Sequence, residues 1–217
     1  MPGPLAILLG LLVGAAAGAA NGLLVTKVRL PPFIVTLGTL NIFVALTLLY
    51  ATGRTIRDAE LATGLAWLGE TFSIGEVRVT TGVLVMLLMY ALFAFVLKYT
   101  AWGRHVYAVG GNAEAARRAG ISVRRIRMSV FMIGSSLAVV SGIIGASRLQ
   151  SVAPSAGGGN TLLLGVGAAV IGGTSLFGGR GRAIDAVIGG LVIATIPNGL
   201  GLLNQASYIN FIVTGGV

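Results

Sequence analysis

The sequence predicts an all-α protein, a polytopic transmembrane helical bundle with about six crossings and a truncated segment at its C-terminal end. Hydrophobic residues make up 55% of the 217 residues, charged residues make up only 10%, and the mean hydropathy is +0.93. The charges gather in a few short stretches, and the uncharged runs between them reach about 20 residues, which is enough to cross a hydrocarbon core of roughly 30 Å. A water-soluble surface needs many more charges, so the lipid bilayer is the expected solvent.

The basic residues predict which loops face the cytoplasm. Eleven of the fifteen lysines and arginines fall in alternate loops, as the positive-inside rule expects of a chain that crosses a membrane several times. This distribution accounts for the net charge of +9, which would otherwise suggest a nucleic-acid partner. We therefore expect no nucleic acid to bind.

The first two uncharged runs predict two helices joined by a short basic turn. They extend over residues 5–26 and 31–52. Pro31 and Pro32 separate them, because proline suits the first turn of a helix and forces the residue before it out of the helical region. The basic turn should be cytoplasmic. The mixed-sign segment 53–78, which holds four of the six acidic residues, should form an extracytoplasmic loop.

The later apolar runs predict the remaining helices, at residues 79–97, 128–147, 161–177 and 183–203. The run at 161–177 is short and glycine-rich, so a full crossing and a broken or re-entrant helix both remain open. Pro197 predicts a kink in the last of these helices. The apolar end, 208–217, covers only about half a bilayer, and the first helix lacks a signal-peptide leader. We therefore expect helices upstream and an interrupted membrane segment at the C-terminal end.

Glycine recurs every four residues along the first run, at Gly10, Gly14, Gly18 and Gly22. A stripe of small residues lets another helix backbone approach closely. We favour packing within one subunit over a dimerisation face, because small residues line most membrane-helix interfaces.

Polar side chains also occur at membrane depth, where each needs a partner or water. None of them is charged, which suits a neutral, hydrogen-bonding solute better than an ion. For any single position we favour a hydrogen bond between helices, whereas the residues taken as a set favour a solute path. The set comprises Asn21, Thr36, Thr39, Asn41, Ser135, Ser136, Ser141, Thr195, Asn198 and Asn204.

Catalysis finds little support in the sequence. His105 is the only histidine and lies in a basic loop, and no pair of membrane-embedded aspartates is present. With no cysteine either, we expect no catalytic residue and no metal site. The glycine-rich segment 172–182 lacks the Gly-Lys-Ser/Thr ending of a phosphate-binding loop, so a tight cytoplasmic hairpin is the better interpretation.

The most specific feature lies in the cytoplasmic basic loop, residues 98–127. There, segment 112–120 predicts a capped helix of two turns. Asn112 can cap its start, and Gly120 can close its end in the left-handed conformation.

Charge supports the same short helix. Glu114 lies near the positive end of the helix dipole and within reach of Arg117 and Arg118. Ser122 can then cap the next helix. A short rigid helix between two membrane spans would give a partner protein a lever, whereas the alternative is a solvated surface turn.

The sequence of this short helix resembles a motif of a known protein family. Glu114-Ala115-Ala116, followed three residues later by Gly120, resembles the EAA loop of ABC importer permeases, the segment that docks onto the ATP-binding subunit. Together with segments 171–181 (Ile-Gly-Gly-Thr-Ser-Leu-Phe-Gly-Gly-Arg-Gly) and 31–39 (Pro-Pro-Phe-Ile-Val-Thr-Leu-Gly-Thr), the chain closely resembles permease subunits of ribose- and xylose-type monosaccharide importers, within the branched-chain amino acid/ribose permease superfamily.

The resemblance implies that residues 1–217 are part of a single permease domain in the inner (plasma) membrane. Its implied partners are a cytoplasmic ABC ATPase subunit, an extracytoplasmic sugar-binding protein and a second permease copy that forms a homodimer. ATP and magnesium would bind to the ATPase, and this chain would carry no cofactor.

The resemblance also implies site residues. Those implied to dock the ATPase are Asn112, Glu114, Ala115, Ala116, Arg117, Arg118 and Gly120. Those expected along the substrate path, some of them from the polar set above, are Thr36, Thr39, Asn41, Gln150, Asn160 and Asn198.

The solute itself stays open. Many relatives carry acidic residues just before the Ile-Gly-Gly-Thr-Ser motif, where this chain has Asn160-Thr161-Leu162-Leu163-Leu164. One alternative is a permease of the same superfamily for branched-chain amino acids, nucleosides or a signalling furanose. A more distant one is a non-transporting membrane scaffold or channel.

Overall fold

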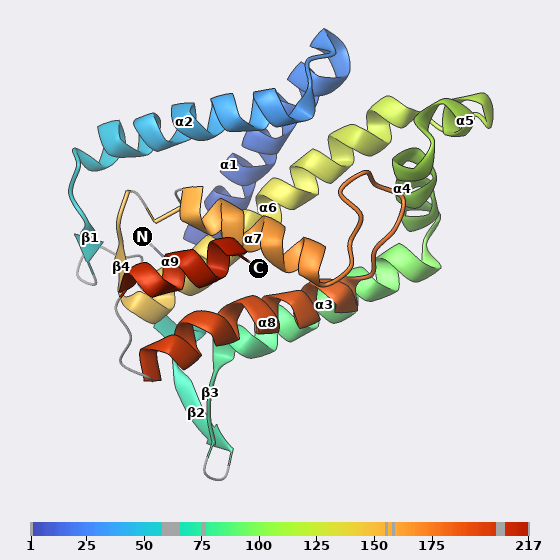
Figure 1. Cartoon of the computed structure of the whole chain (residues 1–217). Coiled ribbons are helices and arrows are strands. Elements are labelled where there is room, and N and C mark those ends of the chain that lie inside the picture. Colours follow the sequence, from blue (N-terminus) through green and yellow to red (C-terminus); the bar gives the residue numbers. More distant parts are fainter. Residues whose placement is uncertain are drawn as a thin grey trace. The chain divides into compact units, whose positions relative to one another are not determined.

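The computed structural model, drawn in Figure 1, describes residues 2–57, 66–74, 77–154, 156–157, 159–202 and 207–216. The chain divides into two compact units. Unit 1 comprises residues 1–88 and 122–158, and unit 2 comprises residues 89–121 and 159–217. Five helices among the described residues are long and apolar enough to cross a membrane. The predicted all-α polytopic bundle is therefore confirmed.

The five long helices follow the predicted apolar runs closely. They are α1 (Gly3–Leu23) with its π-helical continuation η1 (Leu24–Val28), α2 (Pro32–Ala51), α3 (Thr81–Tyr99), α6 (Val123–Leu149) and α8 (Ala183–Leu202). As expected, Pro32 lies in the first turn of α2. Pro197 lies inside α8.

The run at 161–177 forms a shorter helix than a full crossing requires. Helix α7 (Gly159–Ile171) has 13 residues, which span roughly 20 Å at 1.5 Å per residue. It ends because Gly173 adopts a φ of +102°, where glycine carries no steric penalty. The described residues therefore hold five long helices and this shorter one, where the sequence suggested six crossings. A further short helix, α9, covers Ser207–Gly216.

The glycine stripe of α1 packs against α6 within unit 1. A Cβ on Gly14 would lie 2.6 Å from a methyl group of Val139, and one on Gly18 would collide with the backbone oxygen of Phe131. At Gly14 an added Cβ would force the Val139 side chain to shift, and at Gly18 it would meet backbone that cannot move aside, so only glycine fits at position 18. The predicted packing within one chain is confirmed.

Short strands occur in unit 1 where the sequence predicted only a polar loop. Strand β1 (Ile56–Arg57) pairs antiparallel with β4 (Ser151–Val152), and β2 (Thr71–Ile74) pairs antiparallel with β3 (Val77–Thr80). A 3-10 turn, η3 (Ala66–Leu68), precedes the hairpin. Residues 58–65 and 75–76 of the predicted loop 53–78 lie outside the described residues.

In unit 2, most of the predicted basic loop is helical. Helix α4 (Ala101–Gly111) directly follows α3, and helix α5 (Ala113–Arg118) follows α4. The sequence did not predict α4. Its start is capped, since the amide of Gly103 donates a hydrogen bond to the Thr100 hydroxyl at 3.1 Å.

The predicted cap at Ser122 is wrong. Ser122 precedes α6, but its side chain forms no capping hydrogen bond. Its backbone, at φ −73° and ψ 86°, differs from that of Thr100, at φ −95° and ψ 157°, whose extended conformation turns the hydroxyl toward the first helical turn.

Candidate functional site

Helix α5 begins at a residue that serves two helices. Asn112 is both the C-cap residue of α4 and the N-cap residue of α5. Its Oδ1 accepts a hydrogen bond from the Ala115 amide at 3.0 Å, which satisfies one of the free amides of the first turn. The predicted cap is confirmed, and it fixes a sharp corner between α4 and α5.

The end of α5 is closed by a paired hydrogen-bond motif. The Gly120 amide donates to the Arg117 carbonyl and the Ile121 amide donates to the Ala116 carbonyl, each at 3.0 Å. Gly120 has a φ of +84°, the left-handed conformation that this motif requires. With both ends satisfied, a helix of six residues keeps a defined shape although it is too short to be stable alone.

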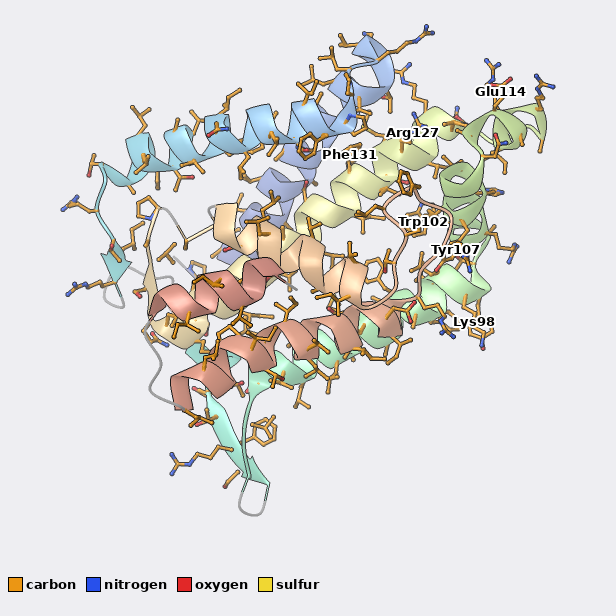
Figure 2. All side chains as sticks on the ribbon, in the orientation of Figure 1. Lys98, Trp102, Tyr107, Glu114, Arg127 and Phe131 are labelled. Carbon is orange, nitrogen blue, oxygen red and sulfur yellow. The ribbon has the colours of Figure 1, made fainter. Side chains whose placement is uncertain are left out.

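The exposed surface of α5 carries a three-residue charge cluster. Arg117 Nη2 lies 2.9 Å and Arg118 Nε lies 3.3 Å from the same Glu114 oxygen, Oε1. The hydrogen bond from Arg117, and then the one from Arg118, lowers the pKa of Glu114. Exposed pairs of this kind stabilise a fold only weakly. Their main result is a cluster with one net positive charge on the surface of α5, centred on Glu114, which Figure 2 labels.

Ala116 points the other way. It is only 5% exposed, whereas Glu114, Ala115, Arg117 and Arg118 are exposed. Helix α5 packs against α4 through contacts within unit 2. The short helix is therefore anchored on one face and presents the opposite face outward.

The glycine-rich segment 172–182 folds into a tight hairpin, as predicted. The Ser175 amide donates to the Arg180 carbonyl at 3.0 Å, and the Gly178 amide donates to the Ser175 carbonyl at 3.1 Å. Gly178 and Gly179 have φ values of +91° and +74°. The hairpin directly joins α7 to α8.

This hairpin, residues 172–182, touches the end of α4. A Cβ on Gly110 would lie 2.6 Å from the backbone nitrogen of Gly179, so the two backbones meet with no room for a side chain. Next to this contact, the Tyr107 hydroxyl donates a hydrogen bond to the Gly181 carbonyl at 2.6 Å. The connection between α7 and α8 is thus fixed to the helix that carries α5.

Two large apolar side chains project from the hairpin. Leu176 is 72% exposed and Phe177 is 98% exposed. Sequence reasoning did not single them out as site residues, although two large apolar residues inside a glycine-rich turn were a usable signal. They extend the candidate contact surface beyond α5.

The residues expected along the substrate path belong to other elements than those that form this surface. On α2, the Thr36 and Thr39 hydroxyls and the Asn41 amide donate hydrogen bonds to backbone oxygens one turn earlier, at 3.0, 3.0 and 2.9 Å. Thr36 and Thr39 are three positions apart and share one face of α2, whereas Asn41 faces away from Thr39. Each of these three side chains thus donates one hydrogen bond within α2, without a solute.

The other three expected residues belong to separate elements. Gln150 ends α6 at a φ of +50°, and its amide donates to the Ser147 carbonyl at 2.7 Å. Asn198 is exposed on α8 in unit 2. Asn160 is the second residue of α7, and its side chain lies outside the described part of the structure. Whether these residues form one path stays a prediction.

The fold and the site together define a class: a multi-pass membrane protein that holds a small capped helix, α5, outside its membrane spans. The whole chain, residues 1–217, matches the family described as the branched-chain amino acid transport system / permease component. The chain therefore belongs to this family of permease components, and it is a multi-pass protein of the inner membrane.

Three of the chain's curated relatives are named as permeases for a sugar. The chain is 39% identical over 217 residues to the fructose import permease of Rhizobium meliloti and 39% identical over 211 residues to the ribose import permease of Bacillus subtilis. It is 38% identical over 209 residues to the D-allose transport system permease of Escherichia coli. These alignments cover 99%, 97% and 96% of the chain but only 60%, 64% and 62% of the relatives. No solved structure matched the chain.

Proposed function

We propose that the chain is part of the permease subunit of an ATP-driven importer that moves a monosaccharide across the inner membrane. The main support is that the whole chain matches a permease family and aligns over almost all its length with fructose, ribose and allose import permeases. This assignment gives the capped helix α5 a role, because a permease subunit driven by a separate ATPase needs a surface on which that ATPase docks.

In this proposal α5 docks the ATPase from the cytoplasmic side. The docking residues are Asn112, Glu114, Ala115, Ala116, Arg117, Arg118 and Gly120. Asn112 and Gly120 fix the shape of the helix, Ala116 anchors it, and the charge cluster on its outer face meets the partner. Leu176 and Phe177 supply apolar contact area beside it.

The hairpin 172–182 gives the docked ATPase a route to the membrane helices. ATP binding would close the ATPase dimer and move α5 together with α4. Because α4 touches Gly179 directly, the ends of α7 and α8 would move too, and the solute cavity would shift from one membrane face to the other. ATP and magnesium belong to the partner, and this chain hydrolyses nothing.

The remaining partners follow from the same assignment. An extracytoplasmic binding protein would deliver the sugar, and a second permease copy would complete the membrane part. Thr36, Thr39, Asn41, Gln150, Asn160 and Asn198 remain the proposed path, since their neutral amides and hydroxyls match a sugar's hydroxyl groups.

Charge reversal tests the docking surface. In the complete permease, the double variant Arg117→Glu, Arg118→Glu should lose ATPase co-purification and uptake, because it replaces one net positive charge by three negative charges on α5. Affinity for the binding protein should stay unchanged. The control is Arg124→Glu, Arg125→Glu at the start of α6, which reverses as many charges on the same loop outside α5. Normal uptake by the α5 variant would refute the docking role.

The solute is tested separately, by reconstituting the complete permease with its ATPase and binding protein. Labelled fructose, ribose, allose and xylose should be compared with leucine, because the family description names branched-chain amino acids. ATP-dependent uptake of one sugar supports the proposal. Uptake of leucine alone would favour the amino-acid alternative. If neither these solutes nor a labelled nucleoside or signalling furanose is taken up, a non-transporting scaffold is favoured.

A further inference from the structure

A cavity of about 480 Å³ lies within unit 2, where α3, α4 and the start of α8 meet. None of the residues proposed for docking or for the substrate path lines it. Its walls divide into an apolar half and a basic half, and each half comes from more than one element.

Membrane-spanning helices form the apolar half. Ala94 and Leu97 belong to the last turns of α3, and Ala183 and Ile184 begin α8. Both helices are long and apolar enough to cross a bilayer. The ends of a membrane-spanning helix lie near the boundary of the hydrocarbon core, so acyl chains are the apolar groups expected beside this half of the cavity.

Two cationic side chains form the basic half. Lys98 lies in the last turn of α3, with its Nζ 5.1 Å from the centre of the neighbouring Tyr99 ring, and Arg182 directly precedes α8. Long basic side chains at span ends reach toward lipid headgroups. Tyr107 completes this side, with its hydroxyl held on the Gly181 carbonyl.

One carboxylate offsets part of this charge. Asp185 Oδ1 lies 3.5 Å from Arg182 Nε, and Asp185 Oδ2 accepts the Arg182 backbone amide at 2.8 Å. The Asp185 side chain is 15% exposed, whereas that of Arg182 is 80% exposed. The acid is thus largely engaged in the first turn of α8, and the guanidinium extends past it.

We propose that this cavity binds an anionic phospholipid of the cytoplasmic leaflet. The phosphate lies between Lys98 and Arg182, and an acyl chain continues along Leu97 and Ile184. A basic pocket between membrane helices on the cytoplasmic side is a known arrangement for acidic headgroups. A soluble anion would leave the apolar half unused, and a sugar would find few hydrogen-bonding groups there. The proposal goes beyond transport and ATPase docking, because neither needs a lipid site.

The test measures lipid binding to the purified full chain in neutral detergent by native mass spectrometry. Phosphatidylglycerol should bind more tightly than phosphatidylethanolamine. The variant Lys98→Gln, Arg182→Gln should weaken phosphatidylglycerol binding by about 30-fold, since each cation near the surface contributes about fivefold. The matched control, Arg124→Gln, Arg125→Gln, removes two cations elsewhere in the basic loop and should change binding less than about twofold.

A second variant separates a cavity from simple surface charge. Ala94→Trp keeps every charge but fills the apolar half, so it should also weaken phosphatidylglycerol binding. If the double charge variant misfolds, Lys98→Gln and Arg182→Gln alone should each give about a fivefold loss.

Four results would overturn the proposal. These are equal affinity for the two lipids, equal losses in the pocket variant and its control, unchanged binding by Ala94→Trp, and displacement of phosphatidylglycerol by millimolar inorganic phosphate. The last result would indicate a soluble-anion site.

Discussion

Two adjacent glycines at the end of α4 offer a sharp test of the link between α4 and the hairpin. A Cβ at Gly110 would lie 2.6 Å from the Gly179 nitrogen, whereas a Cβ at Gly111 would lie 4.0 Å from the Gly179 Cα. Gly110→Ala should therefore disturb the contact, and Gly111→Ala should not. The two variants are matched in chemistry and in position.

The expected magnitude follows from the geometry. To reach an ordinary contact of 3.4 Å, the new methyl group and the Gly179 nitrogen must separate by about 0.8 Å, and both belong to backbone that cannot rotate away. Overpacking of this kind costs about 1–3 kcal/mol. Replacing glycine by alanine in a helix also stabilises by up to ~1 kcal/mol, but this gain is common to both variants and cancels in the comparison.

Hydrogen exchange of the purified chain measures the result locally. A loss of about 1–3 kcal/mol should make the amides of the hairpin 172–182 exchange roughly 5 to 150 times faster in Gly110→Ala than in Gly111→Ala. In the complete transporter, only Gly110→Ala should also reduce the coupling of ATP hydrolysis to uptake. Equal exchange in the two variants would mean that the hairpin does not rest on Gly110, and the proposed route from α5 to α8 would fail.

Three further predictions concern the elements that hold the site. Asn112→Ala should cost about 1 kcal/mol and speed exchange of the α5 amides about fivefold, whereas Ser122→Ala, which removes no cap, should leave exchange at the start of α6 unchanged. Gly18→Ala should lower the free energy of unfolding in detergent by about 1–3 kcal/mol, while Gly134→Ala, with open space around its Cβ, should leave it unchanged or raise it by up to ~1 kcal/mol. Because the pKa of Glu114 is lowered from 4.5, its ion pairs should persist at neutral pH and be lost only as pH falls below that value. A carbon-13 titration that placed this pKa above 4.5 would contradict the charge cluster.

The sequence predicted those parts of the fold whose cause is local. An uncharged run of about 20 residues has few alternatives to a membrane helix, so the five long helices follow from composition alone. The ends of α5 were also predictable, because Asn112 and Gly120 are the residue types that terminate helices. The length of α7 could not be predicted in this way, because Gly172 and Gly173 allow a helix to end but do not require it to end there.

Features that depend on distant partners were missed. Strand β1 is two residues long and pairs with β4 almost a hundred positions later, so neither segment carries a strand pattern of its own. Helix α4 was hidden by its mixed composition, in which Arg104 and His105 interrupt the apolar residues. Its cap at Thr100 was a signal that could have revealed it.

The contact between Gly110 and Gly179 bears directly on how the proposed transport stroke would work. Side chains can change rotamer and absorb a displacement of several tenths of an ångström, but two backbones in direct contact cannot. A movement of α5 toward the hairpin would therefore displace α4 and the hairpin by nearly the same distance. When α4 moves away, the hydrogen bond from Tyr107 to Gly181 would keep the hairpin attached to it. The Gly110–Gly179 contact would thus transmit movement of α4 toward the hairpin, and the Tyr107–Gly181 hydrogen bond would transmit movement away from it. Tyr107→Phe removes the hydrogen bond but leaves the backbone contact in place. We therefore expect the step driven by ATP binding to keep its rate and the return step to slow. Equal slowing of both steps would show that the hydroxyl serves only to stabilise the fold.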